Sequence, residues 1–290
     1  MKPKQLSLLA QVKKNERFPI IAQGLHLLAE NVEALTADAE ILNDRERYRA
    51  GGILTSLAAE EAAKAMMLLD LTRIGWDNNE TTAEVLKWWY NHLARGLYVR
   101  AYEGKPASLK EVRDYMDFYR RERYLDGPND VDWLFHNEVS HHREAPLYVD
   151  YLQNEDGTGS WASPAAYASV YLDGFSSPPH QPMIIGVLSS MSAAGLLTVK
   201  GLKATRQVWD GVEIDDETHW TVVEGLNRAT LENLYRDPPP TLPTDPALVA
   251  ALCLVVDGWV FPLTGLNMSE TKVSLREIAQ QREDWLAAQY

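Results

Sequence analysis

The sequence predicts a mainly α fold, a helical bundle with a small inserted β-hairpin and a C-terminal helical extension. Apolar residues recur at steps of three and four over most of the first hundred residues, which is typical of helices with one buried face. A short segment near residue 150 alternates in polarity and is rich in β-forming residues. A proline-rich stretch over residues 237–246 cannot be helical. We therefore expect a bundle over residues 15–236, a hairpin at about 145–163, and a linker with C-terminal helices packing on the bundle over 237–290.

Two long helices are predicted at the start of the chain. The first carries a single apolar stripe, formed by Ile21, Leu25, Leu28, Val32, Leu35, Ala39 and Leu42. Asn43 and Asp44 have side chains that cap helix starts, so we expect them to cap the second helix. The second helix is predicted from about Arg45 to Thr72, because Gly75 follows it.

Two further helices complete the first half. The third is predicted over about Thr81–Tyr102, and it stops before the breaker segment Gly104–Pro106. Ser108 and Glu111 form a capping box, which begins the fourth helix. We expect that helix to continue into the basic run Arg120–Arg123.

The second half begins with the predicted hairpin. Its strands are expected at Leu147–Tyr151 and Ser160–Ala162, with a turn over 154–159 and a loop over 174–182 farther on. Later helices are predicted from periodicity at about 183–196, 199–211 and 218–235, followed beyond the linker by a buried helix at 247–256 and an amphipathic one at 274–288.

Composition narrows the class of protein. The chain of 290 residues has 28 basic and 41 acidic residues, a net charge of −13, which argues against broad charge-driven binding to nucleic acid or to an anionic membrane. The single cysteine, Cys253, excludes an intramolecular disulfide and a cysteine-based zinc site. The N-terminal apolar run is too short for a signal peptide, and the longest apolar stretches fall short of a membrane span. We expect a cytoplasmic protein without a membrane partner.

The second helix places charged residues where a core is expected. Glu61 and Lys64 fall on one apolar stripe, and a neighbouring stripe contains Glu60 with Lys64 instead. Buried charges are costly unless they are paired, so a structural ion pair and a polar site between helices are both consistent with the pattern. We expect Glu61 and Lys64 to be buried and hydrogen-bonded between helices.

The third helix supplies a partner for these charges. His92 lies on its apolar line, and Arg95 follows three residues later. Such a histidine is a structural residue in one interpretation and a member of an acid–base cluster with Glu61 and Lys64 in the other.

Four segments resemble the AbiV branch of the HEPN superfamily. They are the small-apolar, Glu-Glu, Lys-Ala helix over 53–65, the Asn-His-Leu-Ala-Arg segment over 91–95, the Leu-Tyr-Val-Asp hairpin over 145–151 with Trp161 and Pro164, and the helix pair over 194–202 with Trp209. The resemblance implies a HEPN-type bundle, often dimeric, in a bacterial anti-phage protein that halts growth or translation. It also favours Tyr148 and Asp150, which share one strand face, as neighbours of Lys64, His92 and Arg95.

Enzymatic activity stays open at the level of sequence. Ribonuclease members of the wider superfamily carry Arg, four to six residues, then His, and none of the seven histidines here has an arginine at that spacing. The closest approach is Lys87 before His92. The candidate catalytic residues are therefore His92, Lys64 and Glu61, and the candidate binding residues are Glu60, Arg95, Tyr148 and Asp150. A ribonuclease would use His92 with Lys64, Lys87 or Arg95.

No metal and no cofactor are expected. A di-metal bundle needs two Glu-x-x-His motifs on separate helices, and this chain has one, Glu138 to His141. His136, His141 and His142 are expected in a solvated loop.

Three functions remain: a protein that binds a phage or host target, a ribonuclease, and a helical scaffold with a structural polar cluster. The expected partners are a second copy of the chain, a phage or host protein, and RNA as a further candidate. The segment Lys105–Arg123, with six cations, four anions and interleaved aromatic residues, could contact RNA or form an ordinary charged helix face.

Overall fold

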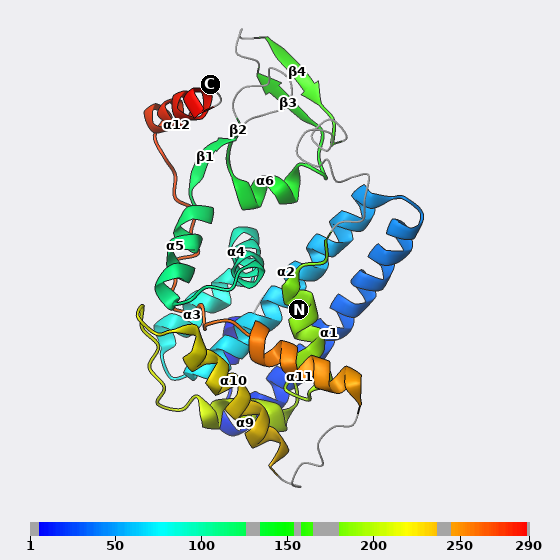
Figure 1. The fold of residues 1–290 in the computed structure, drawn as a ribbon, viewed down its shortest axis with the longest axis vertical. Helices are drawn as coiled ribbons and strands as arrows, with labels where there is room; N and C mark the ends of the chain where they lie inside the picture. Colours follow the sequence, from blue (N-terminus) through cyan, green and yellow to red (C-terminus); the bar gives the residue numbers. More distant parts are fainter. Residues whose placement is uncertain (1–5, 126–133, 154–157, 165–179, 237–244, 289–290) are drawn as a thin grey trace.

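The computed structural model describes residues 6–125, 134–153, 158–164, 180–236 and 245–288. A short helix, η1 (Leu6–Gln11), precedes a long antiparallel pair formed by α1 (Lys14–Asp44) and α2 (Tyr48–Ile74), which runs along one side of the molecule (Figure 1). The predicted stripe of α1 is confirmed, since Ile21, Leu25, Leu28, Val32 and Ala39 are buried. The mainly α fold predicted from sequence is thus confirmed.

The cap predicted for α2 is wrong. Asn43 and Asp44 form the last turn of α1, and the residue before α2 is Arg47, whose side chain makes no capping hydrogen bond. Between the helices Glu46 adopts a φ of 58°, in the left-handed region that reverses the chain here.

The third predicted helix is two helices. α3 (Asn79–Trp88) and α4 (His92–Glu103) are separated at Asn91, whose side chain accepts a hydrogen bond from the Ala94 amide at 3.2 Å. Asparagine competes for backbone hydrogen bonds and so favours a new helix start over a continuous helix. His92 therefore becomes the first residue of α4, where the ring can reach α2.

The fourth helix begins as predicted and ends earlier. Ser108 caps α5 (Leu109–Tyr119) by accepting from the Glu111 amide, but the following basic run is extended. β1 (Glu122–Leu125) pairs antiparallel with β2 (Leu134–Asn137), which leads directly into α6 (Glu138–Glu144). The solvated loop expected around His141 is wrong, because Asn137 caps α6 and His141 is buried. The side chain of His136 lies outside the described residues.

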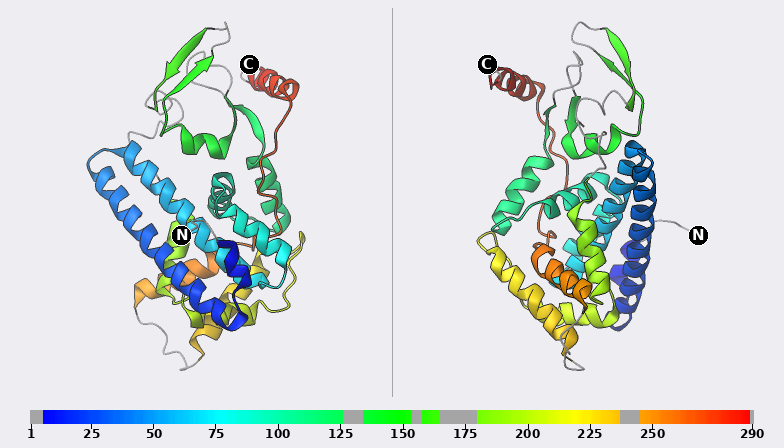
Figure 2. Two further views of the ribbon diagram at one scale, coloured as in Figure 1. Left: turned by 180° about the vertical axis from the view of Figure 1, so that it is seen from behind. Right: turned by 45° about the vertical axis from the view of Figure 1, so that its right-hand side comes forward.

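The predicted hairpin is confirmed, but its first strand begins at Asp150, three residues later than predicted. β3 (Asp150–Gln153) pairs antiparallel with β4 (Gly159–Ala162), and Tyr151 lies opposite Trp161. It projects beyond α6, at the end of the molecule opposite α9 and α10 (Figures 1 and 2). Most of the predicted turn, the loop before residue 180 and the linker before residue 245 lie outside the described residues.

The later described helices are α8 (Met183–Ala193), α9 (Val199–Val208), α10 (Trp220–Tyr235), α11 (Pro246–Gly258) and α12 (Leu275–Ala288). Of these, α8 and α9 pack on the α1–α2 pair, and α10 and α11 extend the core from them. The prediction of a buried helix at 247–256 is wrong for most of its length: α11 is apolar all round, but only its C-terminal end, at Val255 and Val256, is buried. α12 packs on β1, with an ion pair from Arg121 to Glu277 and ring contact between Tyr124 and Trp285.

A fully buried ion pair ties the chain after α11 to α2. Arg73 donates to Asp70 at 3.4 Å and to the Val260 carbonyl at 2.5 Å, and its guanidinium lies between the rings of Trp209 and Trp259. Burial raises the pKa of Asp70 to about 6, although Arg73 opposes the shift, and burial lowers the pKa of Arg73 to about 10. Within the described residues, no helix has both the length and the apolar character needed to span a membrane.

Candidate functional site

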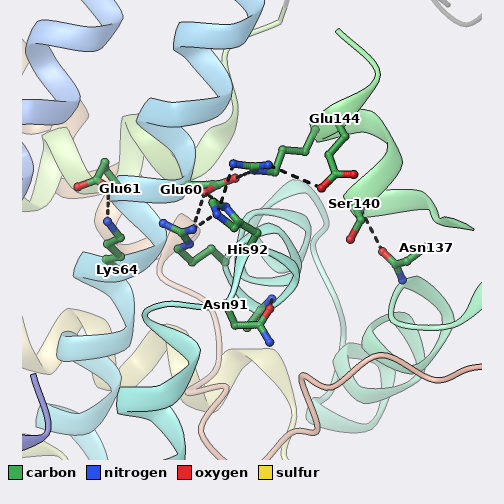
Figure 3. A network of polar contacts seen from close by, with 11 residues as sticks. Glu60, Glu61, Lys64, Asn91, His92, Asn137, Ser140 and Glu144 are labelled. Atoms are coloured by element: carbon green, nitrogen blue, oxygen red, sulfur yellow. Dashed lines mark hydrogen bonds and ion pairs between the residues drawn. The ribbon is translucent and has the colours of Figure 1, made fainter. Parts of the chain in front are cut away.

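Glu60 is the centre of a polar cluster at the junction of α2, α4 and α6. Glu60 is buried, at 6% exposure, and lies on a face of α2 whose other buried residues are mostly small and apolar. Arg143 of α6 donates from Nε to Glu60 Oε1 at 2.8 Å, and Arg95 of α4 approaches Oε2 at 3.1 Å. His92 Nδ1 lies 3.0 Å from the same Oε2 (Figure 3). One carboxylate of α2 therefore holds three side chains, two from α4 and one from α6.

The His92 ring is half exposed, at 50%, and both of its nitrogens have arginine neighbours. Arg95 Nη2 lies 2.6 Å from Nδ1, and Arg143 Nη2 lies 3.4 Å from Nε2. Arginine only donates, so each neutral tautomer satisfies different partners. With the proton on Nδ1, the ring donates to Glu60 and accepts from Arg143. With the proton on Nε2, it accepts from Arg95.

The two arginines of the cluster contact two carboxylates. Arg95 and Arg143 both approach Glu60, and Arg143 also has Glu144 at 3.9 Å. Burial lowers the pKa of Arg95, while Glu60 and Glu61 raise it. A buried guanidinium group is costly without a counter-charge, so Arg95 depends on Glu60.

Glu61 and Lys64 form a separate pair. They interact within α2 at i,i+3 spacing and are 21% and 15% exposed, so the prediction that they are buried between helices is wrong. Lys64 lies over the ring of Trp89, and the pair stands apart from Glu60 on the same helix (Figure 3). Of the two stripes considered for α2, the one that contains Glu60 faces the interior of the protein.

The predicted contribution of the hairpin is absent for Tyr148. That residue lies between α6 and β3, is 52% exposed, and its hydroxyl forms no hydrogen bond within the described part of the chain. The side chain of Asp150 lies outside the described residues, so its predicted contact stays a prediction. The structure thus brings together Glu60, His92 and Arg95.

Arg143 is the member of the cluster that sequence reasoning missed. Val139 and Arg143 are four residues apart and share the inner face of α6, where Val139 contacts Gly96 and Arg143 reaches Glu60. Asn137 caps this helix by accepting from the amides of Val139 and Ser140. The sequence did contain one indication of this helix, namely Asn137 as a cap followed by Val139 and Arg143 at i,i+4 spacing.

A pocket of about 310 Å³ adjoins the cluster between α2, α4, α6 and the chain entering α8. Glu60 and Arg143 form one wall, and Arg100 and His142 form another. Glu138, one turn before His142 on α6, has a lowered pKa. A hydrogen bond from His142 and the nearby arginines lower this pKa, while burial raises it. Among the residues that the structure describes, no three His, Cys, Asp or Glu side chains could hold a metal ion.

In chemical terms the site offers an imidazole between a buried carboxylate and two guanidinium groups. The carboxylate can orient the ring, and the guanidinium groups can bind a phosphate or carboxylate. Lys64 is paired with Glu61 and Lys87 is exposed, so Arg95 and Arg143 are the cations in contact with His92.

Comparison with known sequences identifies the family. No curated protein and no solved structure matches this chain. The sequence model of the AbiV family of HEPN domains matches residues 20–170, just over half of the chain, and this span includes Glu60, His92, Arg95 and Arg143. The name of the family refers to abortive infection, which indicates a role in anti-phage defence. Three of the four resembling segments lie within this match, and the fourth, over 194–202 with Trp209, lies beyond it. The resemblance to the family is confirmed, and the chain belongs to the AbiV family of HEPN proteins.

Proposed function

We propose that this protein acts in the cytoplasm of a bacterium and halts growth or translation during phage infection by binding a phage or host target. The observation that supports this proposal is the cluster around Glu60. Buried ion networks contribute little to stability compared with apolar packing, so their presence beside a pocket favours a binding role.

Phage plating tests this function. A phage-sensitive bacterium that expresses the chain should show reduced plaque formation, and Arg143→Gln should restore it. Arg113→Gln is the matched control, because Arg113 is also a partly exposed arginine in an ion pair, with Asp216, and does not line the pocket. Circular dichroism should show that both variants fold. Equal protection by Arg143→Gln and the wild type would favour the alternative of a helical scaffold with a structural cluster.

Metal-independent RNA cleavage is a second candidate, favoured by His92. Its ring is half exposed, with a carboxylate at Nδ1 and Arg143 beside Nε2. In such a reaction the ring would remove the proton of a ribose 2′-hydroxyl, whose oxygen attacks the adjacent phosphorus. The 5′-oxygen of the next nucleotide would leave with a proton, which gives a 2′,3′-cyclic phosphate, while Arg95 and Arg143 stabilise the added negative charge.

Incubation of purified protein with total RNA or tRNA tests this candidate. Cleavage by the wild type and its loss in His92→Ala would support it, particularly if Glu60→Gln shifts the pH dependence of cleavage. Intact RNA under all conditions would leave target binding as the function.

We also propose that the chain forms a homodimer. An apolar groove of about 750 Å³ lies along η1 and α1 and includes the exposed residues Leu8, Ile20 and Leu27. Together with Gly24, which has open space beside it, Ile20 and Leu27 form a second stripe on α1, adjacent to the buried one. Light scattering should give twice the mass of one chain at micromolar concentration, and Leu27→Glu should give the monomer mass.

A further inference from the structure

The C-terminal end of the chain lies along β1 as an outer layer. We name residues 269–288, which include α12, the C-terminal arm. Thr271 donates a backbone hydrogen bond to the Arg120 carbonyl at 2.8 Å and accepts one from the Glu122 amide at 2.9 Å. The arm therefore extends the pairing of the β1–β2 hairpin on the edge that β2 does not occupy.

The helical part of the arm is held by few contacts. Ile278 is the one buried residue among the α12 side chains that the structure describes. The ion pair between Arg121 and Glu277 joins side chains that are 47% and 41% exposed. The side chain of Gln281 accepts a hydrogen bond from the Tyr124 amide at 3.0 Å. An isolated helix of 14 residues is marginal in water, so α12 depends on β1 for its helical structure.

The β1–β2 hairpin joins the arm to α6. Arg123 of β1 forms an ion pair with Glu138 of α6 at 3.3 Å, and the ring of the next residue, Tyr124, contacts α12. Successive side chains of a strand point to opposite faces, so β1 contacts α6 on one face and α12 on the other. α6 in turn places Arg143 at 2.8 Å from Glu60. A continuous set of contacts thus runs from the arm to the Glu60 cluster.

None of the elements along this route is long enough to be stable alone. β1 and β2 have four residues each, and a two-stranded hairpin is marginally stable in water. α6 has seven residues, fewer than the roughly 12–15 that an isolated helix needs. Each element therefore depends on its neighbours, whereas α1 and α2 share a large buried core.

We propose that α12, the β1–β2 hairpin and α6 open together as one cooperative unit, which removes Arg143 from Glu60 while the α1–α2 core stays folded. His92 and Arg95 belong to α4, so they stay beside Glu60 when the unit opens. Release of the C-terminal arm thereby dismantles one side of the cluster. As regulation of target binding this inference rests on the proposed function, but the cooperativity is a property of the purified chain.

Native-state hydrogen exchange of the full chain tests the unit without any substitution. At urea concentrations below the global unfolding transition, the amides of α12, β1 and α6 should share one opening free energy and one dependence on urea. That opening free energy should be lower than the value for α2. Different values for α12 and α6 would show two independent openings and would overturn the proposal.

A charge reversal in the arm contact tests the coupling from one end. Arg121→Glu replaces the exposed ion pair by repulsion, and it should speed exchange in α12 and α6 by the same factor, about fivefold. Adding Glu277→Arg restores the pair in reverse and should return both helices to the wild-type rates. Arg113→Glu is the matched control, because it reverses another exposed pair, with Asp216, and it should leave both rates unchanged.

Arg143→Gln tests the coupling from the other end. It weakens the contact of α6 with Glu60, and it should speed exchange in α6 and α12 by one common factor, while slow exchange in α2 shows that the core folds. Faster exchange confined to α12 in Arg121→Glu, or confined to α6 in Arg143→Gln, would refute the cooperative unit. Failure of phage protection or of RNA cleavage changes none of these exchange measurements.

Discussion

Gly96 of α4 and Val139 of α6 lie in such close approach that a β-carbon at position 96 would overlap Val139 Cγ1. This contact sets the spacing between the two helices, and so it fixes how far Arg143 extends toward Glu60. The absence of a side chain at Gly96 is therefore a condition for assembling the cluster.

Gly96→Ala should destabilise the protein and displace α6. Overpacking at such a contact costs about 1–3 kcal/mol in the free energy of unfolding, measured by urea denaturation. Gly225→Ala is the matched control, because Gly225 lies within α10 but has nothing within 4 Å of its β-carbon position. It should increase the free energy of unfolding by roughly 0.5–1 kcal/mol through helix propensity alone. Similar gains in both variants would contradict the proposed role of the contact.

Neutralising Glu60 should destabilise the fold far more than neutralising Glu61. Glu60→Gln leaves Arg95 buried without its counter-charge and weakens the hold on Arg143, which should cost about 3 kcal/mol. Glu61→Gln removes a partly exposed pair within one helix and should cost less than about 1 kcal/mol. Chemical denaturation of both variants under the same buffer conditions gives the comparison, and equal losses would count against it.

Periodicity was sufficient for those parts of the fold in which local pattern and packing agree. The stripe of α1 was read correctly, because a single buried face sets its pattern. The hairpin was found from its β-forming residues and its turn, although Tyr151 and Trp161 are exposed. α11 shows the limit of this reasoning. Its apolar residues point in all directions, so its sequence cannot indicate that only Val255 and Val256 are covered.

The candidate site was only partly predictable, for reasons specific to its residues. Glu60, His92 and Arg95 are recognisable as charges within a helical core. Arg143 comes from a helix of seven residues, too short to show a period, and it reaches Glu60 across 83 positions of sequence. The buried pair of Asp70 and Arg73 was also missed, because its partners Val260 and Asn227 become neighbours only through tertiary packing.

Trp285→Ala should loosen the support of α6 without affecting the bundle. Trp285 of α12 contacts Tyr124 of β1, and β1 pairs with the strand that leads into α6. The aromatic contact is worth about 1 kcal/mol. Its loss should make amide exchange in β1 and α6 roughly fivefold faster, which hydrogen–deuterium exchange measures. Exchange in α2 should not change. Leu286→Ala, at an exposed neighbouring position, is the control, and an equal effect of both variants would exclude the specific role of Trp285.

The buried carboxyl of Asp70 should make stability fall as pH rises through the weakly acidic range. Its pKa is about 6 in the folded protein against 3.8 as the ordinary value, so the folded state binds the proton more tightly than the unfolded state. The contribution of this group is fully present below pH 3.8, decreases between pH 4 and 6, and is lost above the folded pKa. Other carboxyl groups act in the opposite direction, as Glu138 does with its lowered pKa. The effect of Asp70 therefore has to be isolated by a variant.

Asp70→Asn provides that comparison, because an amide oxygen can still accept from the Leu263 amide and the Tyr98 hydroxyl. Between pH 4.5 and 7.5 the wild type should lose roughly 2 kcal/mol in free energy of unfolding relative to Asp70→Asn. Urea denaturation at several pH values measures both curves. Asp114→Asn, in an exposed pair with Lys110, should run parallel to the wild type over the same range. If the curves of Asp70→Asn and the wild type are also parallel, the carboxyl of Asp70 does not change its protonation with folding, and the buried pair has no role in the pH dependence.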